Sequence, residues 1–282
     1  MEYAISTLNC RGKILDLSYP QVMGILNLTP DSFYDGGKFS DRDNALIECG
    51  RMLKAGASII DIGGMSSRPG AKIIPVGDEI KRVASVITAI RENYPEAILS
   101  LDTVRSEVAR VGLELGVHIL NDISAGQIDS QIWKVAAAYQ VPYVLMHMQG
   151  VPENMQENPN YGNVLEELFD FFSFRIAKLR AFGVQDIILD PGFGFGKSVA
   201  DNYLLLKQLA VFKNLELPIL VGLSRKSMIC KVLGVNPPQA LNGTTALHMV
   251  ALQNGARILR VHDVREAVET IKLWHQLELT DQ

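Results

Sequence analysis

The stretch "PILVGLSRKS", residues 218–227, joins an apolar run to a polar, charged tip. The run does not alternate between apolar and polar residues, which favours a strand buried on both faces, as in a parallel sheet. Ser224, Arg225 and Lys226 follow it directly. A buried strand that ends in charged residues predicts a functional site at the carboxyl edge of its sheet.

This pattern occurs seven more times, and each apolar run precedes or follows a segment with helical periodicity. Val76, Ile80, Val83 and Ile87 illustrate it, since their spacing places them on one helix face. Eight alternating strands and helices predict an α/β protein, a (β/α)8 TIM barrel, with a doubly wound open sheet as the alternative. The other runs are "VMGILN" (22–27), "SIIDIGG" (58–64), "ILSLD" (98–102), "VHILND" (117–122), "YVLMHM" (143–148), "IILD" (187–190) and "RILRVHD" (257–263).

The N-terminal residues 1–20 stand before the first barrel strand. "YAIST" and "GKILDL" flank Arg11-Gly12, which predicts a short N-terminal β-hairpin. No low-complexity segment or linker-like composition divides the 282 residues, and a barrel needs roughly 250. We therefore expect residues 1–282 to form a single barrel domain.

Composition limits the class of partner. The formal charge is −4 and no basic stripe is present, which argues against a nucleic-acid partner. No apolar run approaches the ~18 residues of a membrane helix, so we expect no membrane association. The three cysteines are far apart in the sequence and form no Cys-x-x-Cys pair. A soluble, cytoplasmic protein with reduced thiols is the expectation.

The polar residues at the carboxyl ends of the strands carry the functional information, because all eight ends of a barrel share one mouth. Arg260 and His262 lie two apart on one strand and so face the same side. Acids, amides and bases converging on one rim predict a ligand site with an anion-binding side. The residues at the strand ends are Asn27, Met65, Ser66, Ser67, Arg68, Asp102, Asn121, Asp122, His147, Asp190, Ser224, Arg225, Lys226, Arg260 and His262.

Several of these residues also have a purely structural interpretation. An aspartate after a strand is often a turn former or a helix cap, which applies to Asp102 and Asp122. His147 lies between two methionines and is more typical of a core histidine. Lys226, Arg260 and His262 are harder to explain in this way, because an unpaired charge in apolar surroundings is costly.

The stretch "DPGFGFGKS", residues 190–198, looks like a phosphate loop but matches neither known pattern. The P-loop pattern would need glycine at Pro191, and the dinucleotide pattern would need it at Lys197. No His-x-x-x-His or cysteine cluster indicates zinc either. Mg²⁺ held by one or two protein oxygens and ligand phosphates would leave almost no trace in a sequence.

Five segments taken together resemble the dihydropteroate synthase family, and they occur in the family's order from about Leu15 to the last helix. "HILNDIS" (118–124) and "LMHMQGVPENMQ" (145–156) fit the same family. Five long motifs in the correct order are specific to a family. The segments are "GILNLTPDSFYDGG" (24–37), "DIGGMSSRPGA" (61–71), "LDPGFGFGK" (189–197), "VGLSRKSMI" (221–229) and "RVHDV" (260–264).

The resemblance implies a transferase of folate biosynthesis, the target of sulfonamides. It would condense 6-hydroxymethyl-7,8-dihydropterin diphosphate with p-aminobenzoate to give 7,8-dihydropteroate and pyrophosphate, with Mg²⁺ as cofactor. These small molecules would be its substrates, and its late helices would form a homodimer.

The resemblance also implies a role for each matching residue. Lys226, Arg260, His262, Arg68 and Asp102 would be catalytic, and Asn27 would hold the metal. Asp102, Asn121, Met146, Asp190, Lys226 and Arg260 would bind the pterin. Asn27, Ser67, Arg68, Arg260 and His262 would bind the diphosphate. Phe33, Asp35, Ser67, Pro69, Phe195, Lys226 and Ser227 would bind the aminobenzoate.

Elementary chemistry agrees with this implied assignment. An aspartate such as Asp190 can form two parallel hydrogen bonds to the N–C–N edge of a pterin. Arg260 can stack on the ring while donating to phosphate. Arg68, Arg260, His262 and Mg²⁺ would act as cations that meet the charge of the leaving pyrophosphate. Lys197 is left without a chemical role and is expected to be solvated or structural.

The chain departs from the family at the second loop, where Met65 replaces a glutamate and Ser67 a threonine. Our hypothesis is an active synthase with altered affinity for aminobenzoate or sulfonamides. Two alternatives remain at this stage. One is a methyltetrahydrofolate-dependent methyltransferase domain on the same barrel. The other is a catalytically silent pterin-binding protein, of which Met65 would be an early sign.

Overall fold

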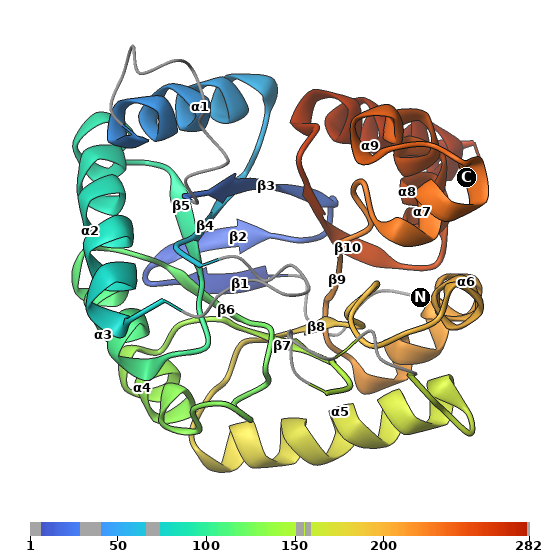
Figure 1. Cartoon of the computed structure of the whole chain (residues 1–282), viewed down its shortest axis with the longest axis horizontal. Helices are drawn as coiled ribbons and strands as arrows, with labels where there is room; N and C mark the ends of the chain where they lie inside the picture. The colour runs from blue at the N-terminus through green and yellow to red at the C-terminus, as the bar shows by residue number, and fades with distance from the viewer. Residues whose placement is uncertain (1–6, 29–40, 66–73, 151–154, 156–158, 281–282) are drawn as a thin grey trace.

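The structure, a computed structural model, describes residues 7–28, 41–65, 74–150, 155 and 159–280 (Figure 1). Within these residues, eight parallel strands close into a barrel in the order β10-β3-β4-β5-β6-β7-β8-β9. The predicted barrel is thereby confirmed, and the open-sheet alternative is wrong. The strands are β3 (Gln21–Asn27), β4 (Ile59–Gly63), β5 (Ile98–Asp102), β6 (Ile119–Asp122), β7 (Tyr143–Met146), β8 (Ile187–Asp190), β9 (Ile219–Val221) and β10 (Ala256–Val261).

Helices surround the barrel and form the outer ring seen in Figure 1. They bury one face each; α2 buries Val83, Val86, Ile87 and Ile90, as the periodicity predicts. Within the described ranges, none of the helices is long and apolar enough to cross a membrane. The helices are α1 (Asp41–Ala55), α2 (Val76–Asn93), α3 (Ser106–Glu114), α4 (Gln131–Tyr139), α5 (Val164–Ala181), α6 (Val199–Lys207), η2 (Leu209–Leu215), α7 (Ser227–Leu233), η3 (Pro237–Gln239), α8 (Leu241–Gln253) and α9 (Val264–Leu279).

A hairpin precedes the barrel, as predicted. Strand β1 (Thr7–Cys10) pairs antiparallel with β2 (Lys13–Asp16), and in Figure 1 the two strands lie at the centre of the ring of helices. Leu8, Cys10, Leu15 and Leu17 are buried in one cluster with apolar barrel residues. The hairpin therefore closes one end of the barrel with an apolar plug. The barrel residues of this cluster are Met23, Ile59, Ile119, Val144, Ile188, Leu220 and Ile258.

The polar residues of the mouth lie two positions further along the same strands. Asp61 follows Ile59 in this way, and Arg260 follows Ile258. Residues two apart on a strand face the same side, so the apolar layer and the polar layer both project into the barrel. The strand register places Asp102 beside Asn121 and Met146 beside Asp190. The fold thus stacks a polar layer on the apolar plug. We call this layer the polar floor; it consists of Asp61, Asp102, Asn121 and Arg260.

Replacing Leu8 with Ala tests the plug. Leu8 is fully buried, so Leu8→Ala is expected to lower the free energy of unfolding by about 2–5 kcal/mol through lost burial and a residual cavity. Denaturant unfolding measures this change. Ile14→Ala is the matched control, because Ile14 lies in the same hairpin but is 65% exposed; equal effects of the two changes would contradict the plug.

Candidate active site

The guanidinium of Arg260 is the centre of the polar floor. Its Nε donates to Oδ2 of Asp61 at 2.7 Å, and Nη2 donates to Oδ2 of Asp102 at 2.8 Å. Nδ2 of Asn121 donates to the same Asp61 oxygen at 2.9 Å. The side chain of Asp61 is fully buried and that of Arg260 is 18% exposed. Strands β4, β5, β6 and β10 therefore meet in one hydrogen-bonded group.

Burial dominates the electrostatics of this group. It raises the pKa of Asp102 to about 7, which the charge of Arg260 opposes and the charge of Asp61 reinforces. Burial also acts on Arg260, but Asp61 and Asp102 outweigh it and raise the pKa of the guanidinium above its ordinary value. Arg260 therefore stays charged, while Asp102 changes its protonation near neutral pH.

A second group of side chains forms around Asp190 at the end of β8. The amide of Gly192 donates to Oδ1 of Asp190 at 2.8 Å, and burial raises the pKa of this carboxyl. Nζ of Lys226 lies 4.1 Å from the centre of the Phe195 ring. Burial lowers the pKa of Lys226 to about 8. An acid, a cation and an aromatic wall therefore line one side of the mouth.

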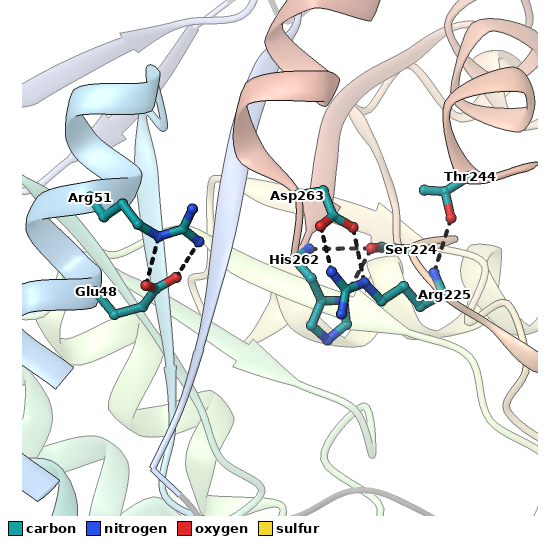
Figure 2. A network of polar contacts seen from close by, with 7 residues as sticks. All are labelled: Glu48, Arg51, Ser224, Arg225, Thr244, His262 and Asp263. Carbon is teal, nitrogen blue, oxygen red and sulfur yellow. Dashed lines mark hydrogen bonds and ion pairs between the residues drawn. The ribbon is translucent and has the colours of Figure 1, made fainter. Parts of the chain in front are cut away.

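His262 is held from one side by Ser224. Oγ of Ser224 lies 3.0 Å from Nδ1 of His262 and accepts a hydrogen bond from its backbone amide at 3.2 Å (Figure 2). Burial lowers the pKa of His262 to about 4, and the nearby charges of Arg225 and Arg260 act in the same direction. The imidazole is consequently neutral at pH 7. Burial first, and the neighbouring cations second, thus favour the neutral imidazole over the cation expected from the sequence.

An ion pair joins the ends of β9 and β10. Nε of Arg225 donates to Oδ2 of Asp263 at 3.0 Å, and Nη2 donates to Oδ1 at 2.5 Å (Figure 2). Arg225 has a φ of 57°, a left-handed conformation that is unusual for a residue other than glycine. Its amide donates to Oγ1 of Thr244 at 3.2 Å. The pair and the threonine together fix the backbone between Ser224 and Lys226.

Asn27 ends β3 at the same mouth. It is the register partner of Gly63, and a Cβ added to Gly63 would stand 3.3 Å from Oδ1 of Asn27. The missing side chain of Gly63 leaves space beside the amide oxygen. Among the described residues, no group of three or more His, Cys, Asp and Glu could hold a metal ion. The site therefore fits Mg²⁺ only as an ion that takes one protein oxygen and completes its sphere with ligand phosphates and water.

An apolar wall stands beside the charged groups. Met65 is half-buried and packs against this cluster, so the residue that replaces the family's glutamate makes ordinary hydrophobic contacts here. Met146, predicted to line the pterin slot, belongs to the same cluster. Its buried members are Val104, Ile123, Met146, Met148, Met155 and Phe195.

The structure brings most of the predicted residues together. Asp102, Asn121 and Arg260 share one network, and Ser227 begins α7 directly after Lys226. Asp122 is structural, since it accepts hydrogen bonds from the amides of Ser124 and Gly126 within its own turn. Phe33, Asp35, Ser67, Arg68 and Pro69, all predicted for the loops, lie outside the described residues.

Sequence reasoning missed two buried acids. Asp61 lies within "SIIDIGG", where a single carboxylate interrupts an apolar run; that interruption was the available signal. Glu79 lies among charged neighbours on α2, where nothing in the sequence marks it as buried. It is fully buried instead: its Oε1 accepts from Oγ1 of Thr103 at 2.8 Å and its Oε2 from Arg105 at 2.7 Å. Arg105 lies 26 residues from Glu79 along the chain, so their pairing produces no periodic pattern in the sequence.

Asp61→Asn tests the electrostatic coupling in the polar floor. The substitution removes a negative charge that raises the pKa of Asp102. Arg260 then no longer shares its positive charge between Asp61 and Asp102. Both effects lower the pKa of Asp102, so its midpoint is expected to move below 7. Carboxyl-carbon NMR titration of labelled aspartate measures the shift. Asp16→Asn, at the exposed hairpin, is the control and should leave Asp102 unchanged; an unshifted Asp102 in Asp61→Asn would contradict the coupling.

Comparison with known proteins agrees with this geometry. The pterin binding enzyme family matches residues 23–262. Dihydropteroate synthase from Escherichia coli K12 is 46% identical over 265 residues, which cover 93% of each chain.

Two solved structures are similar over nearly the whole chain. Dihydropteroate synthase of Yersinia pestis with a sulfonamide drug complex has a TM-score of 0.91 and 44% identity, over 96% of this chain and 99% of that one. The Xanthomonas albilineans enzyme with 4-aminobenzoic acid has a TM-score of 0.91 and 40% identity, over 97% and 98%. The family prediction is confirmed: the chain belongs to the pterin-binding enzymes and, among them, to the dihydropteroate synthases.

Proposed function

We propose that this chain condenses 6-hydroxymethyl-7,8-dihydropterin diphosphate with p-aminobenzoate, giving 7,8-dihydropteroate and pyrophosphate. One observation carries the proposal: Arg260 is held between Asp61 and Asp102 on the polar floor, with Asp190 and Lys226 at the same mouth. Membership in the dihydropteroate synthases supports it, as does the 4-aminobenzoic acid in the Xanthomonas structure.

The pterin would lie over the polar floor. Asp190 would accept hydrogen bonds from the N–C–N edge of the ring, while Asp102 and Asn121 meet its remaining polar atoms. Arg260 already has Nε and Nη2 engaged by carboxylates, which orients its planar face. A guanidinium fixed in this way can stack on a flat heteroaromatic ring. Met146 would line the slot with apolar surface.

The diphosphate would lie toward His262 and Asn27. Neutral His262 would contribute as a hydrogen-bond donor through Nε2, since its Nδ1 faces Ser224. Arg260 supplies a positive charge, and Ser67 and Arg68 are proposed to add to this side. Mg²⁺ bound to Asn27 and the phosphates would offset the negative charge of the leaving group. The protein side chains then orient the diphosphate so that its C–O bond can break.

The aminobenzoate would lie against Phe195. Lys226, whose Nζ lies 4.1 Å from the centre of the Phe195 ring, would line this wall together with Ser227. Phe33, Asp35, Ser67 and Pro69 are proposed to complete the pocket. The aromatic amine would attack the pterin methylene carbon, forming a C–N bond while pyrophosphate leaves and the amine loses a proton. Because Met65 packs against the same apolar wall, we propose that it alters affinity for aminobenzoate and sulfonamides.

The proposed reaction is tested by mixing the protein with dihydropterin diphosphate and Mg²⁺, with and without p-aminobenzoate. Dihydropteroate and pyrophosphate, measured by mass spectrometry, should appear only with both substrates. Arg260→Ala is expected to lower kcat/KM by about 100-fold or more, because it removes a preorganised donor to the developing charge.

Arg265→Ala is the control, since this exposed arginine on α9 pairs only with Glu269 among the contacts shown here. Pterin binding without product in the wild-type protein would support the catalytically silent alternative instead. Met65→Glu would then show whether the missing loop carboxylate explains the silence.

We propose that the chain forms a homodimer through its late helices. Apolar side chains stand exposed on α7 and α9: Val232 is 59% exposed, Leu273 65% and Leu277 51%. In Figure 1 these helices and α8 lie side by side on the same side of the barrel. Large apolar side chains exposed on neighbouring helices support the proposal, because exposed apolar surface is typical of a protein interface.

Light scattering tests the dimer. The wild-type protein is expected to have twice the mass of one chain, and Leu273→Glu with Leu277→Glu to have the mass of one chain, because buried unpaired charges oppose association. Phe174→Glu is the control, since Phe174 is 58% exposed on α5. A wild-type protein with the mass of a single chain would contradict the proposal.

We also propose a cytoplasmic location. Cys10, Cys49 and Cys230 are free thiols in the structure. Free thiols are typical of reducing compartments, and burial raises the pKa of both Cys10 and Cys49 to about 12, which keeps them unreactive.

A further inference from the structure

Lys197 ends the glycine-rich stretch that resembles a phosphate loop. Lys197 is only 3% exposed, so of the two expectations, a solvated or a structural lysine, the first is wrong and the second fits. Nζ donates to the backbone oxygens of Gly192 and Phe195 at 3.0 Å each and of His147 at 3.2 Å. An ammonium group has three protons, and these three carbonyls can take all of them.

A buried ammonium group costs more free energy than an apolar side chain of the same size. Burial lowers the pKa of Lys197 to about 7, although the charge of Asp190 acts in the opposite direction. Removing an ammonium from water is unfavourable unless hydrogen bonds replace those to the solvent. A methionine of similar length would pack here without that cost. The hydrogen bonds to the three carbonyls therefore indicate a specific role.

The three carbonyls belong to two segments that lie against each other. His147 directly follows β7, whereas Gly192 and Phe195 belong to the loop after β8. The contact is so close that a Cβ added to Gly192 would overlap the oxygen of His147, and Gly192 has a φ of +67°. Glycine permits this approach, and Lys197 holds the two segments together.

Lys197 acts on Phe195 more directly than on Asp190. Asp190 is anchored in the sheet, where its carbonyl accepts from the amide of His147 at 3.0 Å. Phe195 lies in the loop, and its backbone is tied at N–H to Gly192 and at C=O to Lys197. Loss of the ammonium would remove the hydrogen bond to the carbonyl of Phe195 and leave the one that its N–H donates. The aromatic wall would then move, while the backbone of Asp190 keeps its anchor in the sheet.

We propose that Lys197 is a positioning residue that holds the Phe195 wall in place and so sets the affinity for the aromatic amine substrate. The inference rests on the proposed function and deepens it. The lysine acts through the backbone of the loop and touches neither substrate. Binding of the pterin and the bond-forming step, which depend on the polar floor, are affected less.

Lys197→Met tests the proposal because it keeps the length of the side chain and removes the ammonium. KM for p-aminobenzoate is expected to rise by about tenfold or more, since small displacements of a positioning group are costly. KM for the pterin diphosphate and kcat should stay within about threefold. Lys231→Met is the matched control. Lys197 and Lys231 both line a cavity of about 220 Å³, but Lys231 is exposed. The kinetic constants of Lys231→Met should match those of the wild type.

An unchanged KM for p-aminobenzoate, or an equal loss in all three constants, would overturn the proposal. If Lys197→Met does not fold, Tyr161→Phe serves instead, because Oη of Tyr161 donates to the carbonyl of Gly196 at 2.7 Å in the same loop. It should raise the same KM by a smaller factor, and an unchanged KM would again overturn the proposal.

Amide hydrogen exchange separates failure of this inference from failure of the proposed function. Amides of residues 192–196 should exchange faster in Lys197→Met than in Lys231→Met, whether or not the protein makes dihydropteroate. A wild-type protein without synthase activity would defeat the proposed function alone. Equal exchange in the two variants would defeat the role of Lys197.

Discussion

The ion pairs of Arg260 with Asp61 and Asp102 are the constraint on which the site depends. Each group is drawn from a different strand, and each would be costly if it were buried without the others. Strands β10, β3, β4 and β5 are consecutive in the barrel, and its curvature lets one guanidinium reach both carboxylates. The fold and the charge distribution are therefore parts of one arrangement. The apolar plug at the opposite end has no such requirement, because it contains only apolar barrel and hairpin residues.

The segments around this floor are held by side chains that act on backbone atoms. Lys197 binds carbonyls of the glycine-rich loop, and Arg225 with Asp263 fixes the tip that carries Lys226. Three glycines of the loop have positive φ values, so the loop backbone has little conformational preference of its own. Distant side chains supply the order that the glycines lack. A site of this kind can place ligand-binding groups on loops without losing their geometry.

The electrostatics follow from the number of cations in a small, buried space. Burial lowers the pKa of His262 to about 4, and the charges of Arg225 and Arg260 act in the same direction. Arg260 carries the positive charge because two carboxylates stabilise it. Met65 belongs to the apolar wall of methionines and an aromatic ring rather than to this charged group. The charged floor and the apolar wall suit a polar heterocycle and an aromatic ring, respectively.

The sequence by itself determined the alternation of strands and helices, the polar strand ends and the family, because periodicity and motifs are local properties of a chain. It also predicted Asp102, Asn121, Asp190, Lys226 and Arg260, which lie at or just beyond the carboxyl ends of their strands. Only the tertiary structure decided that Asp61 pairs with Arg260 and Glu79 with Arg105, that Lys197 is buried, and that burial lowers the pKa of His262. These properties depend on which distant groups become neighbours and on how far water is excluded from them. Neither quantity has a period or a spacing that can be read along a sequence.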